Sequence, residues 1–215
     1  MELIRVDTQR AYERIRQMIT TLELAPGSTL DEGRLAGEID LGLAPVREAL
    51  KLLVHDNLVE VASQGGIFVA SVSIPDLEQI SELRGLLESF CAGQAAQRAT
   101  PDDIAILEAL RQEQITIPAQ DSQRWFDLDH KFHRAIAQAA HNKYLSQTLE
   151  HLFGLSQRLW YLALPHLDFL PGAVQVHLDL VAAIKDGDAY RAEALMSAHV
   201  RDFYAKVSGI LAEKE

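Results

Sequence analysis

Apolar residues in the first quarter of the chain recur every three or four positions, the spacing of amphipathic helices. Pro26 and Gly27 would end the first of these helices. Asp31 or Thr29 would cap the second, and Pro45 suits the first turn of the third. The chain therefore begins with three helices, which we expect at residues 8–24, 31–39 and 44–57.

Two short runs rich in β-branched residues follow, LVEVAS and GIFVASV. Gln64, Gly65 and Gly66 stand between them, and such glycine-rich tripeptides are typical of hairpin turns. A helix, a helix–turn–helix and a hairpin in this order predict a winged helix–turn–helix, which is a DNA-binding fold.

After Pro75 the pattern is helical throughout. The change falls in ASVSIPD (70–76), which predicts two domains, one over 1–72 and one over 73–215. We expect a mainly α protein whose second domain is an all-α bundle of about six helices. These helices are expected at residues 76–98, 101–116, 121–140, 143–163, 171–186 and 188–211.

Composition places the protein in a broad class. A single cysteine, Cys91, excludes an internal disulfide framework and suits a reducing compartment. No run of ~18 apolar residues could span a bilayer, and the opening residues, MELIRVDTQR, contain no apolar signal-peptide core. We therefore expect a cytoplasmic protein that does not interact with a membrane.

The charge balance is acidic, with a formal net charge of −11 for the 215 residues. Residues 1–70 hold 7 Lys and Arg against 11 Asp and Glu, a net of −4, and the rest hold 13 against 20, a net of −7. Neither part is basic overall. Any DNA binding must therefore depend on locally clustered cations.

The stretch DLDHKFHRAI (127–136) places Asp129 and His133 four residues apart, on one face of an expected helix. His177 shares an apolar face with Leu180 and neighbouring residues in HLDLVAAIKDGD, and His199 does so in ALMSAHVRDF. Three imidazoles and one carboxylate turned to a common interior could hold Zn²⁺, Ni²⁺, Mn²⁺ or Fe²⁺. The alternative is that these are ordinary core residues with satisfied hydrogen bonds, as most histidines on apolar helix faces are.

Two sets of motifs resemble a known family. PGSTLDEGRLAGEI with APVREALKLLVHDNLVEVASQGGIFV resembles the winged-helix signature of GntR-type bacterial transcription regulators. The ordered Asp129, His133, His177 and His199, with their flanking residues, are similar to the FadR-C-terminal (FCD) ligand-binding domain. Six bundle helices resemble its shorter, VanR-like branch. The resemblance spans roughly residues 8–210.

For the bundle, the resemblance implies that the four residues ligate a divalent metal whose open positions take water or the carboxylate of a small organic-acid effector. Arg84 resembles an arginine of the first bundle helix that would clamp this carboxylate. The alternative for Arg84 is a surface salt bridge with Glu88, one turn away.

For the first domain, the resemblance implies a homodimer bound to an inverted-repeat operator in double-stranded DNA. Arg47 and Lys51 would extend from the recognition helix and Arg34 from the helix before it, while Gly65 and Gly66 would form the tip of the wing. The alternative for each charged residue is a solvated surface cation.

The sequence departs from the family pattern at the start of the recognition helix. Leu43 stands where an arginine is common, and Gly42 stands where a hydroxyl residue is common. The expected wing, too, has no basic residue. Because phosphate neutralisation supplies much of the affinity for DNA, these changes predict weakened operator binding.

Three functions compete at this point. The first is an effector-responsive transcription regulator, in which a ligand in the bundle shifts the placement of two winged helices. The second is a metal-dependent enzyme that uses the three-His, one-Asp site to activate water. No general base or nucleophile stands out near the ligands, and this absence disfavours the enzyme. The third is an interaction module whose histidines are core residues.

Overall fold

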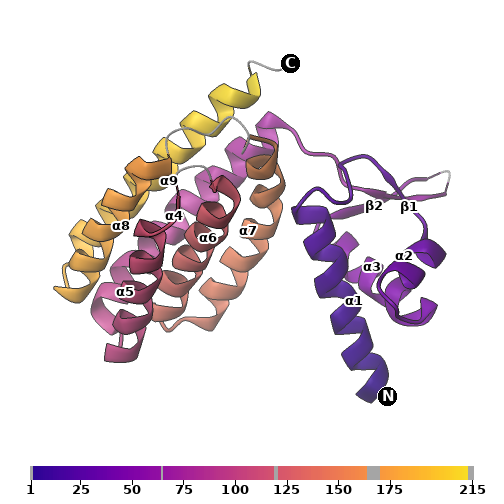
Figure 1. Cartoon of the computed structure of the whole chain (residues 1–215), viewed down its shortest axis with the longest axis horizontal. Helices are drawn as coiled ribbons and strands as arrows, with labels where there is room; N and C mark the ends of the chain where they lie inside the picture. Colours follow the sequence, from indigo (N-terminus) through magenta and orange to yellow (C-terminus); the bar gives the residue numbers. More distant parts are fainter. Residues whose placement is uncertain (1, 64, 119–120, 164–169, 213–215) are drawn as a thin grey trace. The chain divides into compact units, whose positions relative to one another are not determined.

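The computed structural model describes residues 2–63, 65–118, 121–163 and 170–212 (Figure 1). It divides into two compact units, and each is described separately. The first comprises Met1–Ser73 with Gln157–Tyr161, and the second comprises Ile74–Ser156 with Leu162–Glu215. Among the described residues, no helix has the length and apolar character needed to cross a membrane.

The first unit contains three helices, α1 (Glu2–Thr20), α2 (Glu32–Glu38) and α3 (Leu43–His55). The first helix was expected at residues 8–24, but α1 begins six residues earlier, at Glu2, and ends at Thr20. Leu22 has a φ of 64°, in the left-handed region, so the helix cannot continue to Pro26. Pro45 lies in the first turn of α3, as expected.

The cap of α2 follows the sequence closely. The side chain of Asp31 accepts a hydrogen bond from the backbone N–H of Arg34 at 2.7 Å, which confirms Asp31 rather than Thr29 as the N-cap. This cap fixes where the helix–turn–helix begins. Val46, Leu50 and Leu53 of α3 are buried, so the opposite face of α3 is turned to solvent.

The wing is a small antiparallel sheet in the order β1-β3-β2. The expected hairpin corresponds to β2 (Val59–Val61) and β3 (Ile67–Val69), and the Gln64 part of its turn lies outside the described residues. A third strand, β1 (Thr29–Leu30), was missed, because two residues are too short to show an alternating pattern. β1 adds a third strand to the hairpin.

The second unit is a bundle of six helices among the described residues, in agreement with the sequence. Each end lies within two residues of the expected position, and Thr100 closes a capping box with Asp103 at the start of α5. The helices are α4 (Ile74–Arg98), α5 (Pro101–Ile115), α6 (Ser122–Ala139), α7 (Lys143–Ala163), α8 (Leu170–Lys185) and α9 (Ala189–Ala212).

α4 has two contrasting sides. It lies along α9 for much of its length (Figure 1). Its inner side carries the buried polar residues Arg84 and Glu88, whereas Leu86 on its outer side is exposed. Three fully buried aromatic rings surround this polar interior: Phe126 and Phe132 of α6, and Phe153 of α7.

Candidate metal centre and nucleic-acid interface

The four candidate ligands come together in the interior of the bundle. Asp129 and His133 lie one turn apart on α6, His177 lies on α8 and His199 on α9. All four are buried, and one ligand atom from each lies within 4.8 Å of every other. The four-residue spacing of Asp129 and His133 places both on one face of α6. The packing of α8 and α9 against this face brings His177 and His199 to the same point.

The nitrogen and oxygen atoms of the cluster have the separations of a coordination shell. His199 Nε2 lies 3.1 Å from Nε2 of His133 and 3.3 Å from Nε2 of His177. Asp129 contributes Oδ1 at 3.3 Å from His177 Nε2 and Oδ2 at 3.8 Å from His133 Nε2. Donor atoms around a metal with bonds of about 2.0–2.1 Å lie ~3.0–3.4 Å apart at tetrahedral or octahedral angles. Three of the four separations lie in this range, so the cluster fits such an ion once the carboxylate of Asp129 moves slightly toward His133.

Hydrogen bonds at the far side of two rings fix which nitrogen faces inward. Nδ1 of His133 donates to the carboxylate of Glu88 from α4, and Nδ1 of His177 donates to Oε1 of Gln114 from α5 at 2.9 Å. A neutral imidazole with its proton on Nδ1 has a lone pair on Nε2. Nε2 of both rings therefore faces the cluster, and in the neutral form of each ring its lone pair is turned toward a metal, as ligation requires.

The electrostatics keep two of the rings neutral. Burial, with His133 adding to it, lowers the pKa of His199 to about 3. Burial and the neighbouring His199 likewise hold the pKa of His177 well below its usual value. Burial would lower the pKa of His133 as well, but the Glu88 and Asp129 carboxylates outweigh it and raise that pKa. His177 and His199 thus offer unprotonated nitrogens at neutral pH.

The carboxylates differ in their partners. Burial raises the pKa of Asp129 to about 6, and its Oδ1 is a buried oxygen without a hydrogen-bond partner. Burial also acts to raise the pKa of Glu88, but Arg84 and His133 overcome it and lower the pKa to about 2. An unpartnered buried carboxylate oxygen facing three imidazole nitrogens is unfavourable without a cation. The donor set of one oxygen and three nitrogens suits Zn²⁺, Ni²⁺, Mn²⁺ or Fe²⁺.

Arg84 lies in the same buried network. Its Nε donates to Glu88 Oε1 at 2.7 Å, and its guanidinium lies 4.9 Å from the ring centre of Phe153. The alternative expectation, a surface ion pair with Glu88, was half right: the pair exists, but only 6% and 2% of the two side chains are exposed. Glu88 joins Arg84 to His133, which brings the candidate effector residue next to the metal cluster.

Two supporting residues were not identified from the sequence as partners of the ligands. Glu88 was considered only as a partner for Arg84, although it shares the inner face of α4 with that residue. Gln114 lies two turns after Leu107 on α5, and Leu107 is buried. This spacing is the one signal in the sequence that Gln114 faces the interior. Its contact with His177 joins α5 to α8 and could not be read from either helix alone.

The candidate DNA-contacting cations are exposed, and each is paired with a carboxylate. Those of the recognition helix are Arg47, whose Nε lies 2.7 Å from Glu32 Oε2, and Lys51, whose Nζ lies 2.7 Å from Glu48 Oε1. Arg34 of α2 makes the third such pair, with Glu38 at 2.9 Å. Exposed pairs of this kind contribute ~0–1 kcal/mol, so phosphate groups can displace them.

The start of α3 and the wing lack cations. Leu43 is the first residue of α3 and is exposed, and Gly42, its N-cap, forms no side-chain hydrogen bond. Gly65 and Gly66 have φ values of 89° and 103°, which favour glycine. A side chain at Gly66 would also crowd the ring of Phe68. The two glycines allow the tight turn of the wing, and neither brings a charged side chain to it.

Family comparisons agree with this arrangement. The model described as "Bacterial regulatory proteins, gntR family" matches residues 7–69, and the FCD domain model matches residues 79–202. The chain belongs to the GntR family. It is a DNA-binding transcription regulator with a C-terminal FCD domain, of the FadR-like subfamily.

Individual GntR proteins are similar over most of their length. The transcriptional repressor RspR of Escherichia coli K12 is 28% identical over 206 residues, which cover 95% of this chain and 90% of that protein. The repressor GlaR of the same organism is 30% identical over 198 residues, covering 88% and 90%. The solved structure of E. coli McbR/YncC has a TM-score of 0.82 with 22% identity and covers 94% of this chain and 96% of its own.

Family membership decides between two of the competing functions. GntR proteins are transcription regulators and not enzymes. The hypothesis of a metal-dependent enzyme is therefore excluded. The buried Asp and three His residues form a possible metal site in the FCD domain of this regulator.

Proposed function

We propose that this GntR regulator binds a divalent metal through Asp129, His133, His177 and His199, and that a small carboxylate bound there controls its affinity for DNA. Residues 73–215 would form the metal- and effector-binding domain, and residues 1–72 the DNA-binding domain. Two copies would bind an inverted-repeat operator as a homodimer. RspR and GlaR are both named repressors, which supports repression as the mode of action.

One observation carries the metal proposal: hydrogen bonds at Nδ1 hold two imidazoles with Nε2 toward a third imidazole and an unpartnered carboxylate oxygen. In the metal-free cluster a proton on His133 partly offsets the negative charge. A divalent cation would take the place of this proton, with Glu88 and Gln114 holding the rings in orientation. The bound metal would act as a Lewis acid that attracts an anionic ligand.

Charge balance supports a carboxylate effector. Once the His133 proton is displaced, the charged groups of this network are the carboxylates of Asp129 and Glu88 and the guanidinium of Arg84, which sum to −1. A divalent cation changes this sum to +1, and one carboxylate group would neutralise it. Arg84 is the cation best placed to assist, since guanidinium groups bind carboxylates in a planar fork.

The DNA part of the proposal rests on α3. Arg47 would read a base edge, Lys51 and Arg34 would contact phosphates, and Gly65 and Gly66 would let the wing backbone approach DNA closely. Replacing Arg47 by Ala should weaken operator binding by ~1–3 kcal/mol and relax sequence preference. Lys51→Ala should instead weaken binding to all sequences about equally, and this comparison separates the two roles.

A metal analysis tests the centre directly. We expect about one divalent ion per chain in the purified protein. His177→Gln should lose most of it and melt at a lower temperature. The matched control is His141→Gln, which removes an exposed histidine of the same unit whose ring is hydrogen-bonded to Asp103. If His177→Gln retained as much metal as the control, the four-ligand site would be wrong.

A further inference from the structure

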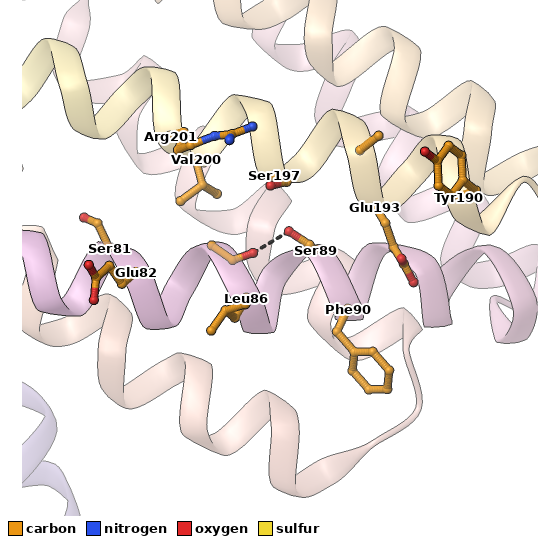
Figure 2. A pocket seen from close by; sticks show the side chains of 12 residues that line it. Ser81, Glu82, Leu86, Ser89, Phe90, Tyr190, Glu193, Ser197, Val200 and Arg201 are labelled. Atoms are coloured by element: carbon orange, nitrogen blue, oxygen red, sulfur yellow. Dashed lines mark hydrogen bonds between the residues drawn. The ribbon is translucent and has the colours of Figure 1, made fainter.

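The open groove between α4 and α9 is separate from the metal cluster. Its volume is about 760 Å³, and Glu82, Leu86 and Phe90 line it from the outer side of α4 (Figure 2). Neither Arg84 nor any of the four candidate metal ligands is among the residues that line it. A ligand that contacts the metal cluster must therefore find its polar partners in the interior of the bundle.

Two buried N–H groups beside His177 have no hydrogen-bond partner in the part of the chain that the structure describes. They are Nε2 of Gln114 on α5 and Nε1 of Trp125 on α6. Both residues are buried, with 2% and 5% of their surfaces exposed. A buried donor without an acceptor costs free energy, because it has given up its hydrogen bonds to water. Two such donors beside one imidazole point to an acceptor that the described residues do not supply.

The tautomer of His177 that can ligate a metal also fixes the orientation of the Gln114 amide. Ligation through Nε2 of His177 requires the proton on Nδ1, and this proton needs an acceptor. Oε1 of Gln114 lies 2.9 Å from Nδ1 and is that acceptor. The other branch of the amide, Nε2, is therefore turned away from His177, and an amide nitrogen only donates.

Trp125 lies on the same face of α6 as two of the ligands. Trp125, Asp129 and His133 follow one another at intervals of four residues, just over one helical turn each. The rings of Trp125 and His177 are stacked, with their centres 6.3 Å apart and their planes 16° apart. An indole N–H donates and does not accept. Gln114 and Trp125 thus approach the same imidazole from two helices, and each brings a donor.

The charge of the site favours a neutral acceptor for these donors. With a divalent cation and one effector carboxylate, the charges of Asp129, Glu88 and Arg84 are balanced to zero. A second carboxylate on the effector would leave an uncompensated negative charge in the interior, which is costly. A carbonyl or hydroxyl oxygen accepts hydrogen bonds from N–H groups without adding charge.

We propose that Nε2 of Gln114 and Nε1 of Trp125 form a subsite for a neutral oxygen of the effector. The protein then selects oxo- or hydroxy-monocarboxylic acids over unsubstituted acids and over dicarboxylic acids. The subsite rests on the carboxylate effector of the proposed function and binds a second part of that molecule. His177 joins the two parts of the site, because its Nε2 faces the metal cluster and its Nδ1 orients Gln114.

A series of four-carbon acids tests the proposal. The probes are butanoate, 2-oxobutanoate, 2-, 3- and 4-hydroxybutanoate, and succinate, and each is titrated into the full-length, metal-loaded protein by calorimetry. The parent chain should bind at least one oxo or hydroxy acid about tenfold more tightly than butanoate, because two unpaired donors gain an acceptor. It should bind succinate no more tightly than butanoate.

Two variants remove the donors one at a time. Trp125→Phe keeps an aromatic ring beside His177 and removes the N–H. Gln114→Glu keeps an acceptor for Nδ1 of His177 and removes the NH2 group, so the metal content should be retained. Each variant should reduce the ratio of the two affinities, oxygenated acid to butanoate, by about threefold or more. This ratio cancels any change in charge or stability that affects both acids.

Two matched controls should keep the ratio of the parent. Trp160→Phe makes the same change at a buried tryptophan of α7 that belongs to the first compact unit. Gln112→Glu adds the same charge at an exposed position of α5. Circular dichroism and metal content establish that each variant is folded and loaded.

The outcomes separate this proposal from the proposed function. An unchanged ratio in either Trp125→Phe or Gln114→Glu overturns the two-donor subsite, as does a parent chain that prefers no oxygenated acid. An advantage limited to the 2-oxo and 2-hydroxy acids that persists in both variants also overturns it, because the oxygen then binds the metal. A preference for succinate that both variants abolish overturns the neutral acceptor. In these cases the carboxylate effector stands, whereas a metal-loaded parent that binds none of the acids, butanoate included, refutes the effector as well.

Discussion

The carboxylate of Glu32 in α2 accepts a hydrogen bond from Nε of Arg47 in α3, across the turn of the helix–turn–helix, at 2.7 Å. Among the described residues, Arg47 forms no other side-chain ion pair. A guanidinium held at Nε presents its two Nη groups as a fork, which is the geometry that reads a guanine edge. If Arg47 reads a base edge as proposed, Glu32 orients it and also places a negative charge beside the bound DNA.

Glu32→Gln should separate these two effects. Removing the charge should tighten binding to random DNA by up to about fivefold for each bound copy, because an exposed ion pair worth ~0–1 kcal/mol no longer competes with phosphate. The ratio of operator to random-DNA affinity should fall, because Arg47 loses its orientation. Fluorescence anisotropy with both DNAs measures this ratio. Glu60→Gln, which removes the same charge from an exposed position on β2, is the control. An unchanged ratio in Glu32→Gln would show that Glu32 does not position Arg47.

Leu43→Arg should strengthen DNA binding by restoring a cation at the first turn of α3. Each phosphate contact steepens the dependence of log K on log salt concentration by roughly 0.9. Two copies per operator should therefore steepen the slope by roughly two contacts' worth. A salt titration of both proteins on one operator measures it. Leu52→Arg, on the same helix and half-exposed, controls for added charge away from the start of α3. Equal slopes for Leu43→Arg and the parent would place Leu43 away from DNA.

Much of the fold was predictable from the sequence because local signals and packing agree. Helical periodicity in the bundle is continuous, and Thr100 with Pro101 marks a helix start without any tertiary information. The short β1 strand was not predictable, because Thr29 and Leu30 pair with β3 across almost forty residues. A strand of two residues has no period to detect.

The metal cluster was only partly predictable from residue positions. Asp129 and His133 could be placed on one face from their spacing alone, whereas the meeting of His177 and His199 depends on how α8 and α9 pack. Polar partners from other helices, such as Gln114, leave no mark in a local pattern. The depth of burial of Arg84 was missed because an Arg–Glu pair one turn apart is usually a surface feature.

Glu88→Gln should weaken metal binding although Glu88 is not a ligand. The change keeps the shape but removes the charge that holds the His133 proton on Nδ1, and such supporting residues are typically worth 10–100-fold in metal affinity. It also removes the carboxylate that pairs with the buried Arg84, so the melting temperature should fall. Competition with a chromophoric chelator measures affinity. Glu82→Gln, the same change on the exposed side of α4, should behave like the parent. If both variants held the metal equally well, Glu88 would have no part in orienting His133.

Metal affinity should depend on pH in two steps. A ligand must lose its proton to bind, so affinity falls as pH drops below the pKa of each group that is protonated in the free site. The raised pKa of His133 gives the first step, and the pKa of Asp129, about 6, gives the second. His177 and His199 add no further step near neutral pH, because burial already depresses the pKa of both rings. Chelator competition between pH 5 and 8 should show the logarithm of affinity falling by up to about two per pH unit below pH 6. A slope near zero throughout would mean that the metal does not displace these protons.

Arg84→Lys should discriminate between a structural and an effector-binding role for this arginine. Lysine keeps the positive charge beside Glu88, so the fold and the metal content should be largely preserved. It loses the planar fork that matches a carboxylate, so the affinity for an acid effector should fall by about tenfold or more. Thermal-shift titration of the metal-loaded protein with mono-, di- and tricarboxylic acids measures this difference, and neutral amides of the same acids serve as control ligands. If Arg84→Lys and the parent chain responded equally to every acid, Arg84 would be a structural partner of Glu88, and the effector carboxylate would have to bind at the metal alone.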